Sequence, residues 1–190
     1  MPVDLIFYKV PTSGLRGVVR HGFWNGVAAS VCRRERRAAG VKCEGGYSVH
    51  VEVGFPMATG VEEEAGSVWM GERVFFRRRS YANRVSGRHG HQHYTIAVPR
   101  VSVGRGVAFL EGQVGKEFNL RGMVGAVTPW ASRSKGERWY CAELVAAVLG
   151  QMGVTLPFPT HKATPGKLEM WAEGVGAVSV NPVHARGGQL

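Results

Sequence analysis

The chain has 190 residues, of which 44% are hydrophobic, and a formal net charge of +10 at pH 7. This length and composition are typical of one compact domain with a sizeable core. No apolar run approaches the ~20 residues that cross a bilayer, and the first ten residues, which include Asp4 and Lys9, lack the apolar stretch of a secretory signal peptide. We therefore expect a soluble, cytoplasmic protein with no transmembrane segment and no signal peptide.

The alternation and the helical spacing of apolar residues predict the elements in chain order. We expect a strand at 4–9, a helix at 13–24, strands at 47–55, 67–70, 73–78 and 93–98, and helices at 103–114, 120–127, 137–150 and 165–171. A basic, Gly-flanked insert, 25–46, separates the first helix from the second strand. Since there is no internal repeat, we expect a single domain over 1–175 and a flexible C-terminal tail over 176–190.

The helix predicted at 137–150 carries a cysteine in its first turn. Its apolar residues have the spacing of a buried helical face: Cys141, Leu144, Val145, Val148 and Met152. A thiol at a helix N-terminus lies beside unpaired backbone N–H groups and the positive end of the helix dipole, which both favour the nucleophilic thiolate. The same N–H groups are placed to donate to an oxyanion. The alternative is that Cys141 is a small buried hydrophobic residue, as free cysteines usually are.

The strand predicted at 47–55 places a histidine among alternating side chains. One face carries Val49, Val51 and Val53, and the other carries Ser48, His50 and Glu52. This pattern predicts a half-buried strand with a polar face. A Cys–His pair is the minimum for thiol-based acyl transfer, because the imidazole holds the thiolate and later protonates the leaving group. The alternative is that His50 is a solvent-facing strand residue.

In this order, a histidine strand before a cysteine helix, the two segments resemble the circularly permuted NlpC/P60 papain-like cysteine hydrolases. Further segments are similar to those of the family in the same order: 5–9, 66–69 with 71–74, and 115–122. The resemblance implies an α+β, permuted papain-like fold in which an antiparallel sheet packs against the helix that carries Cys141. Many relatives are encoded by bacteriophages and large DNA viruses, so the resemblance also implies a viral protein that is cytoplasmic or virion-associated.

The family also needs a polar residue that orients the histidine ring. Glu52 shares a face with His50 and is the first candidate, because a carboxylate beside an imidazole raises its pKa. Ser67, on the following strand, is the alternative third residue. The chain departs from the family pattern in the insert 25–46, which holds Cys32 and Cys43, and at 61–64, where an acidic run interrupts a usually tight hairpin.

The resemblance implies a cysteine peptidase or amidase that cleaves an amide bond. In it Cys141 is the nucleophile, whose own backbone N–H contributes to the oxyanion hole, and His50 is the general base and acid. The substrate left open is a peptidoglycan stem peptide, another peptide or isopeptide, or an acyl lipid, and no cofactor or metal is implied. Two rivals remain: a non-catalytic structural or nucleic-acid-associated virion protein that retains the fold, and a lipid-surface acyltransferase, which predicts an exposed apolar patch.

The positive charge is concentrated in short arginine runs. Contact with a polyanion such as nucleic acid would use Arg33, Arg34, Arg36, Arg37, Arg77, Arg78 and Arg79. No nucleic-acid-reading motif accompanies these runs, so a solvated basic face is the preferred interpretation. His89, His91 and His93 would share one side of a strand, but no nearby carboxylate or thiol completes a ligand set, and we predict no metal site.

Overall fold

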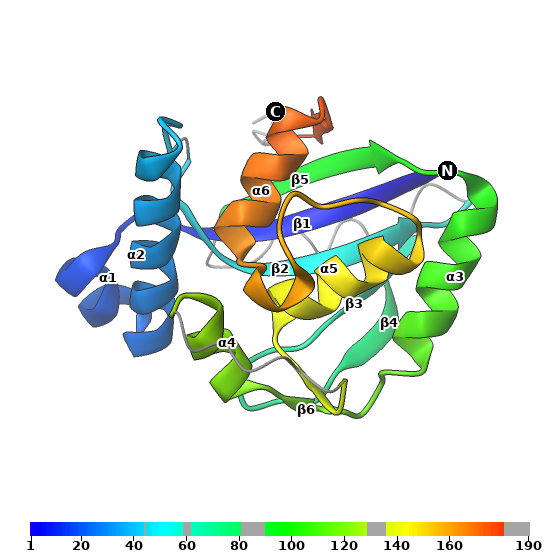
Figure 1. Ribbon diagram of the computed structural model, residues 1–190, viewed down its shortest axis with the longest axis horizontal. Helices are drawn as coiled ribbons and strands as arrows, with labels where there is room; N and C mark the ends of the chain where they lie inside the picture. Colours follow the sequence, from blue (N-terminus) through cyan, green and yellow to red (C-terminus); the bar gives the residue numbers. More distant parts are fainter. Residues whose placement is uncertain (44, 59–61, 81–89, 129–135, 181–190) are drawn as a thin grey trace, which may run out of the picture.

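A six-stranded antiparallel sheet forms the centre of the protein in the computed structural model, which describes all residues except 44, 59–61, 81–89, 129–135 and 181–190 (Figure 1). Among the described residues the strand order is β4-β3-β2-β1-β5-β8. The strands are β1 (Pro2–Val10), β2 (Tyr47–Pro56), β3 (Glu62–Ser67), β4 (Phe75–Ser80), β5 (Gly90–Ala97) and β8 (Val178–Val180). Two short strands, β6 (Glu117–Phe118) and β7 (Arg138–Trp139), pair in parallel outside this sheet.

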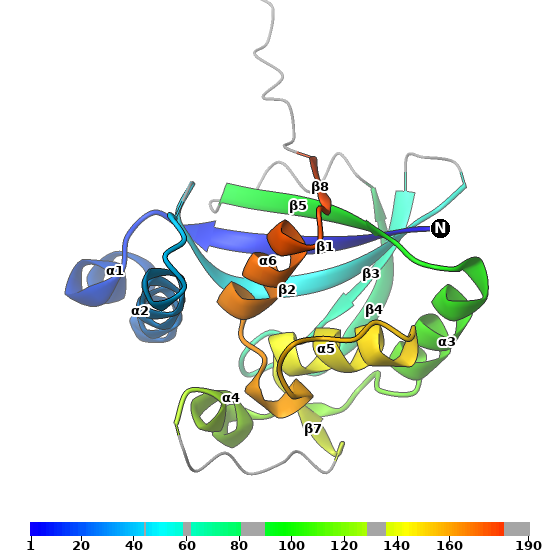
Figure 2. The same cartoon turned by 45° about the horizontal axis from the view of Figure 1, so that its top comes forward.

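Helices cover one side of the sheet, as Figures 1 and 2 show for α2, α5 and α6. Each of these three helices contacts β2. The helices are α1 (Gly14–His21), α2 (Phe23–Ala38), α3 (Arg100–Glu111), α4 (Leu120–Ala126), α5 (Cys141–Gln151) and α6 (Pro165–Gly174), with a 3₁₀ turn at Thr160–Lys162. The prediction of an α+β fold with an antiparallel sheet packed against helices is confirmed.

The core lies between the sheet and α5. The register places Phe7 opposite Val51 and Leu5 opposite Val53, so alternate residues of β1 and β2 point to the same side. These side chains join one buried apolar cluster with the residues of α5, including Leu144, Val145, Val148 and Leu149. This packing holds α5 against the sheet, because burying large aliphatic side chains stabilises a fold by roughly 2 kcal/mol each.

The prediction of a half-buried β2 is wrong, because both of its faces are covered. Ser48, His50 and Glu52 are all buried, whereas Val49, beside them, is only partly buried. Ser48 donates a hydrogen bond to Glu169 of α6, at 2.7 Å. Buried polar groups need partners within the protein, so the polar face of β2 belongs to the interior and is not a solvated surface.

The segment predicted as one helix followed by an insert is two helices. Gly22 has φ 86°, in the left-handed region, and it ends α1 while starting α2. Most of the insert 25–46 then forms α2. The acidic run before Ser67 lies in β3, where Glu64 is opposite Arg78, and opposite charges in register favour this hairpin. Val178–Val180, expected in the flexible tail, pairs with β5.

Candidate active site

Cys141 is the first residue of α5, as its position in the sequence predicted. The N-cap residue is Tyr140, whose side chain makes no capping hydrogen bond to the helix. The first-turn N–H groups therefore remain beside the thiol, and a helix N-terminus attracts negative charge. Cys141 is 8% exposed and lines a cleft.

His50 lies between Cys141 and Glu52. Its Nε2 is 3.5 Å from Glu52 Oε1, an ion-pair distance slightly too long for a good hydrogen bond, and the ring also lies close enough to Cys141 for the two side chains to interact. Burial lowers the pKa of His50, but its interactions with Cys141 and with the Glu52 carboxylate outweigh burial and raise the pKa from 6.5 to about 9. The imidazole is thus held as imidazolium at neutral pH when the thiolate faces it.

Two aromatic rings fix the imidazole plane, and sequence reasoning did not assign either of them to the site. Trp69 stacks on His50 with 3.6 Å between ring centroids and 17° between planes. Tyr8, on the neighbouring strand, meets the same imidazole edge-on at 5.2 Å and also contacts Trp69. The cross-strand register of Tyr8 with His50 was the signal available, once β1 is paired with β2.

Ser67, the alternative third residue, does not face His50. Its hydroxyl donates a hydrogen bond to the Val51 carbonyl oxygen at 2.7 Å, so it is bound to the backbone of β2. Of the predicted site residues, the structure brings together Cys141, His50 and Glu52. Ser67 instead stabilises the strand that carries the histidine.

Glu143 is a site neighbour that the sequence analysis missed. It is buried in the first turn of α5, and its carboxylate accepts hydrogen bonds from the Tyr140 backbone N–H and the Asn119 side chain. Burial raises the pKa of Glu143, these hydrogen bonds lower it, and the result is about 7. A glutamate three residues after the N-cap is the acidic half of a capping box, which was the sequence signal for this contact.

A bulge in β2 shapes the edge of the site. Tyr8 pairs with His50 and Lys9 pairs with Ser48, so Val49 is an extra residue on β2. The bulge turns Val49 toward the cleft while Ser48 reaches α6. Bulges are often found next to active sites because they change the direction of one side chain.

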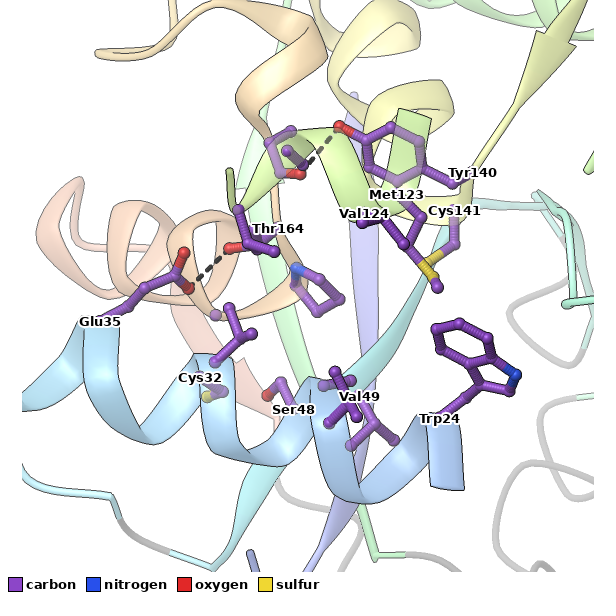
Figure 3. Close-up of a pocket in the computed structure, with 18 residues that line it drawn as sticks. Trp24, Cys32, Glu35, Ser48, Val49, Met123, Val124, Tyr140, Cys141 and Thr164 are labelled. Carbon is purple, nitrogen blue, oxygen red and sulfur yellow. Dashed lines mark hydrogen bonds between the residues drawn. The ribbon is translucent and has the colours of Figure 1, made fainter. Parts of the chain in front are cut away.

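The cleft that leads to Cys141 is almost entirely apolar (Figure 3). It has a volume of about 670 Å³, including space open to solvent. Cys141 lies at the same end of the cleft as Trp24 and Met123, and Cys32 and Glu35 lie at the other end. Its walls come from α2, α4 and the start of α6, and the apolar lining residues are Trp24, Val27, Ala28, Val31, Val49, Met123, Val124, Ala126, Val127, Ala163 and Pro165. Such a cleft suits an extended apolar group attached to a reacting carbonyl.

A buried ionic cluster holds the α2 wall of the cleft against the sheet and α6. Glu169 of α6 accepts from Arg36 at 3.1 Å and pairs with Lys9 at 2.6 Å, and Arg36 also pairs with Glu173. Arg36 was predicted as a polyanion contact, but it is only 3% exposed and is not available for that role. The charge of the guanidinium is neutralised inside the fold instead.

The other predicted polyanion contacts lie on two separate surfaces. Arg33, Arg34 and Arg37 are exposed on α2, and Arg77 and Arg78 are exposed on β4. The side chain of Arg79 lies outside the described part of the chain. In that part, no helix is long and apolar enough to cross a membrane.

The histidine run does not form a ligand set in the described residues, which contain no group of three or more His, Cys, Asp or Glu side chains placed to hold a metal ion. His91 and His93 lie 6.4 Å apart between ring centroids, and Tyr8 packs edge-on against His91. His89 is outside the described residues. All three cysteines are free thiols.

Comparisons of the chain with models of known protein families, with curated proteins and with solved structures found no match. Fold and site together define an α+β protein with a Cys–His–Glu arrangement at the end of an apolar cleft. The function is therefore argued from this geometry.

Proposed function

We propose that the protein is a cysteine hydrolase with a circularly permuted papain-like fold, and that it cleaves an amide bond. The observation that carries the proposal is His50, buried between the Cys141 thiol and the Glu52 carboxylate at the N-terminus of α5. A nucleophile, a base that touches it and a group that orients the base are the parts that covalent acyl transfer needs.

In the first half of the proposed reaction, the Cys141 thiolate attacks the amide carbon and a C–S bond forms. The carbonyl oxygen takes up the electron pair and accepts hydrogen bonds from the first-turn N–H groups, including that of Cys141. The His50 imidazolium then protonates the departing nitrogen, so that the C–N bond breaks and an amine leaves. The products of this half are an acyl thioester on Cys141 and a neutral imidazole.

In the second half, water replaces the amine. His50 accepts a proton from the water, whose oxygen attacks the thioester carbon, and the C–S bond breaks to release the acid and regenerate the thiolate. The Glu52 carboxyl group orients the imidazole and stabilises its imidazolium form. Trp69 keeps the imidazole plane fixed while the ring gives a proton to the departing nitrogen and takes one from water.

The rival interpretation, a non-catalytic virion protein that retains the fold, does not account for the cost of this arrangement. Removing charges from water opposes folding unless each charge is paired. A scaffold gains nothing from a buried histidine and carboxylate aimed at a thiol, whereas a thiol hydrolase requires them. The exposed arginines of α2 and β4 fit both interpretations and do not separate them.

The test is the rate of alkylation of Cys141 by iodoacetamide across pH, followed site by site with mass spectrometry. Cys32 and Cys43 are replaced by serine, because Cys43 is partly exposed and would also react. We expect alkylation at pH 6 at least about tenfold faster than that of an ordinary thiol, whose pKa is near 8.5.

His50→Ala is expected to abolish this acceleration, and His161→Ala, outside the cleft, serves as the matched control. Alkylation of Cys141 with an ordinary thiol profile that neither histidine variant changes would leave the protein a scaffold. A positive result justifies a screen of amide substrates, with Cys141→Ala as the inactive reference.

A further inference from the structure

α1 exposes large apolar side chains to solvent. Leu15 and Val19 are each 80% exposed, and Phe23, at the start of α2, is 59% exposed. Leu15 and Val19 are four residues apart and therefore lie one above the other on the same face of the helix. Isolated exposed apolar residues are ordinary, but a group of them within one short segment marks a contact surface.

This exposure is built into the fold, because α1 is anchored to α2. The Gly14 backbone N–H donates to Ser30 Oγ at 3.0 Å, and Ser30 Oγ in turn donates to the Gly26 carbonyl oxygen at 2.7 Å. At Gly26 the two helices approach so closely that a Cβ atom would overlap the Val18 backbone. Figures 1 and 2 show α1 at one end of the molecule, beyond α2 and away from the sheet.

One of the exposed residues, Phe23, adjoins the cleft. The rings of Phe23 and Trp24 meet edge-on at 5.0 Å, and Trp24 lines the cleft. Val27 and Val31 line the cleft and also a surface groove between α1 and α2. The groove between α1 and α2 and the cleft that reaches Cys141 therefore share two apolar side chains of α2.

The segment that forms α1 and the first three turns of α2 carries positive charge only. Residues 5–34 contain no Asp or Glu. Arg16 and Arg20 are exposed on α1, and Arg33 and Arg34 are exposed on α2. A short segment with exposed apolar residues and arginines is the pattern of a helix that lies in the interface of an anionic membrane.

Other occupants fit this surface less well. A nucleic acid would neutralise the arginines, but its phosphates would leave Leu15, Val19 and Phe23 without a partner. In a two-fold contact between two copies, Arg16 and Arg20 would recur on both sides of one interface, and each copy carries a net charge of +10. An anionic lipid surface satisfies both the apolar and the positive side chains.

We propose that α1 and Phe23 dock on a lipid surface with anionic headgroups, with Leu15, Val19 and Phe23 inserted among the acyl chains and Arg16 and Arg20 among the headgroups. Docking in this way brings the mouth of the apolar cleft to the lipid. This second statement rests on the proposed function. Among the substrates open to that function, docking on lipid selects an amide-linked acyl lipid whose chain occupies the cleft.

The docking is tested by flotation of the full chain with vesicles of phosphatidylcholine, with and without about one third phosphatidylserine. We expect binding only to the anionic vesicles. The double variants Leu15→Ser/Val19→Ser and Arg16→Gln/Arg20→Gln are each expected to weaken the partition onto these vesicles at least about tenfold.

Two matched variants remove the same kinds of side chain elsewhere. Val101→Ser/Val114→Ser removes apolar residues that are 84% and 51% exposed, and Arg77→Gln/Arg78→Gln removes exposed charge from β4. Both are expected to bind like the wild type. Circular dichroism checks that every variant is folded, which the exposure of the changed side chains favours.

Several results would overturn the docking: anionic vesicles left unbound, α1 variants that bind like the wild type, or equal losses in the matched variants. If the protein does not bind vesicles but binds duplex DNA or dimerises in a way that depends on Leu15 and Val19, the α1 surface has that partner and not lipid. Cys141→Ala separates docking from catalysis, because it is expected to bind vesicles fully while it hydrolyses nothing. Vesicle binding that survives alongside an unreactive Cys141 would therefore refute the proposed function and leave the docking intact.

Discussion

Trp69 lies flat against the His50 imidazole, with 3.6 Å between the ring centroids. The stack restricts rotation of the histidine about its side-chain torsions, while Glu52 and Cys141 restrain the ring in its own plane. Three different elements, β2, α5 and the segment after β3, thereby converge on one imidazole.

Trp69→Leu is expected to slow alkylation of Cys141 at pH 6 about tenfold, because a mobile imidazole spends less time beside the thiol. Trp69→Phe keeps a flat ring and is expected to restore most of the rate. The two variants are compared by iodoacetamide labelling. Equal rates in the wild type and in Trp69→Leu would show that the stack has no positioning role.

Glu52→Gln is expected to lower the pH above which the His50 imidazolium loses its proton. The Glu52 carboxylate helps to raise the pKa of His50, so its loss lowers that pKa from about 9. The imidazolium then loses its proton earlier as the pH rises. The His50 titration is followed by NMR, and Glu64→Gln, which removes a carboxylate from the neighbouring strand β3, should leave the midpoint unchanged.

Glu143→Gln is expected to flatten the dependence of stability on pH near neutrality. Burial raises the pKa of Glu143 from 4.5 to about 7, so the folded protein binds this proton more tightly than the unfolded chain. The stability linked to that proton is therefore present at acid pH and is lost as the pH rises from about 4.5 through about 7. Thermal unfolding should show a fall in Tm on the order of 3 °C over this range in the wild type and a smaller one in the variant. Parallel Tm profiles for the two proteins would contradict this account.

Arg36→Met is expected to destabilise the fold by about 3 kcal/mol or more, because it leaves the buried Glu169 with less compensation. Arg37→Met, one residue further along α2 and exposed, should change the free energy of unfolding by less than about 0.5 kcal/mol. Urea denaturation measures both. A small effect at Arg36 would mean that Lys9 alone neutralises Glu169.

The sequence predicted the site best where a local pattern determines structure. Helical spacing placed Cys141 in the first turn of α5, and alternation put His50 and Glu52 on one face of β2. It failed where burial depends on distant elements. Nothing local to β2 indicates that Glu169, more than a hundred residues later, covers Ser48. The exposure of Leu15 and Val19 was equally hidden, because a helical pattern of apolar residues usually marks a buried face.

The buried pairing of Lys9 and Arg36 with Glu169 also sets an order of events during synthesis of the chain. β1, β2 and α2 leave the ribosome well before α6, and until then two cations that will be buried have no anion to face. The same order applies to the thiol, because Cys141 is synthesised 91 residues after His50. Contacts over such separations slow folding, so Cys141 can meet His50 only after nearly all of the sheet has been made.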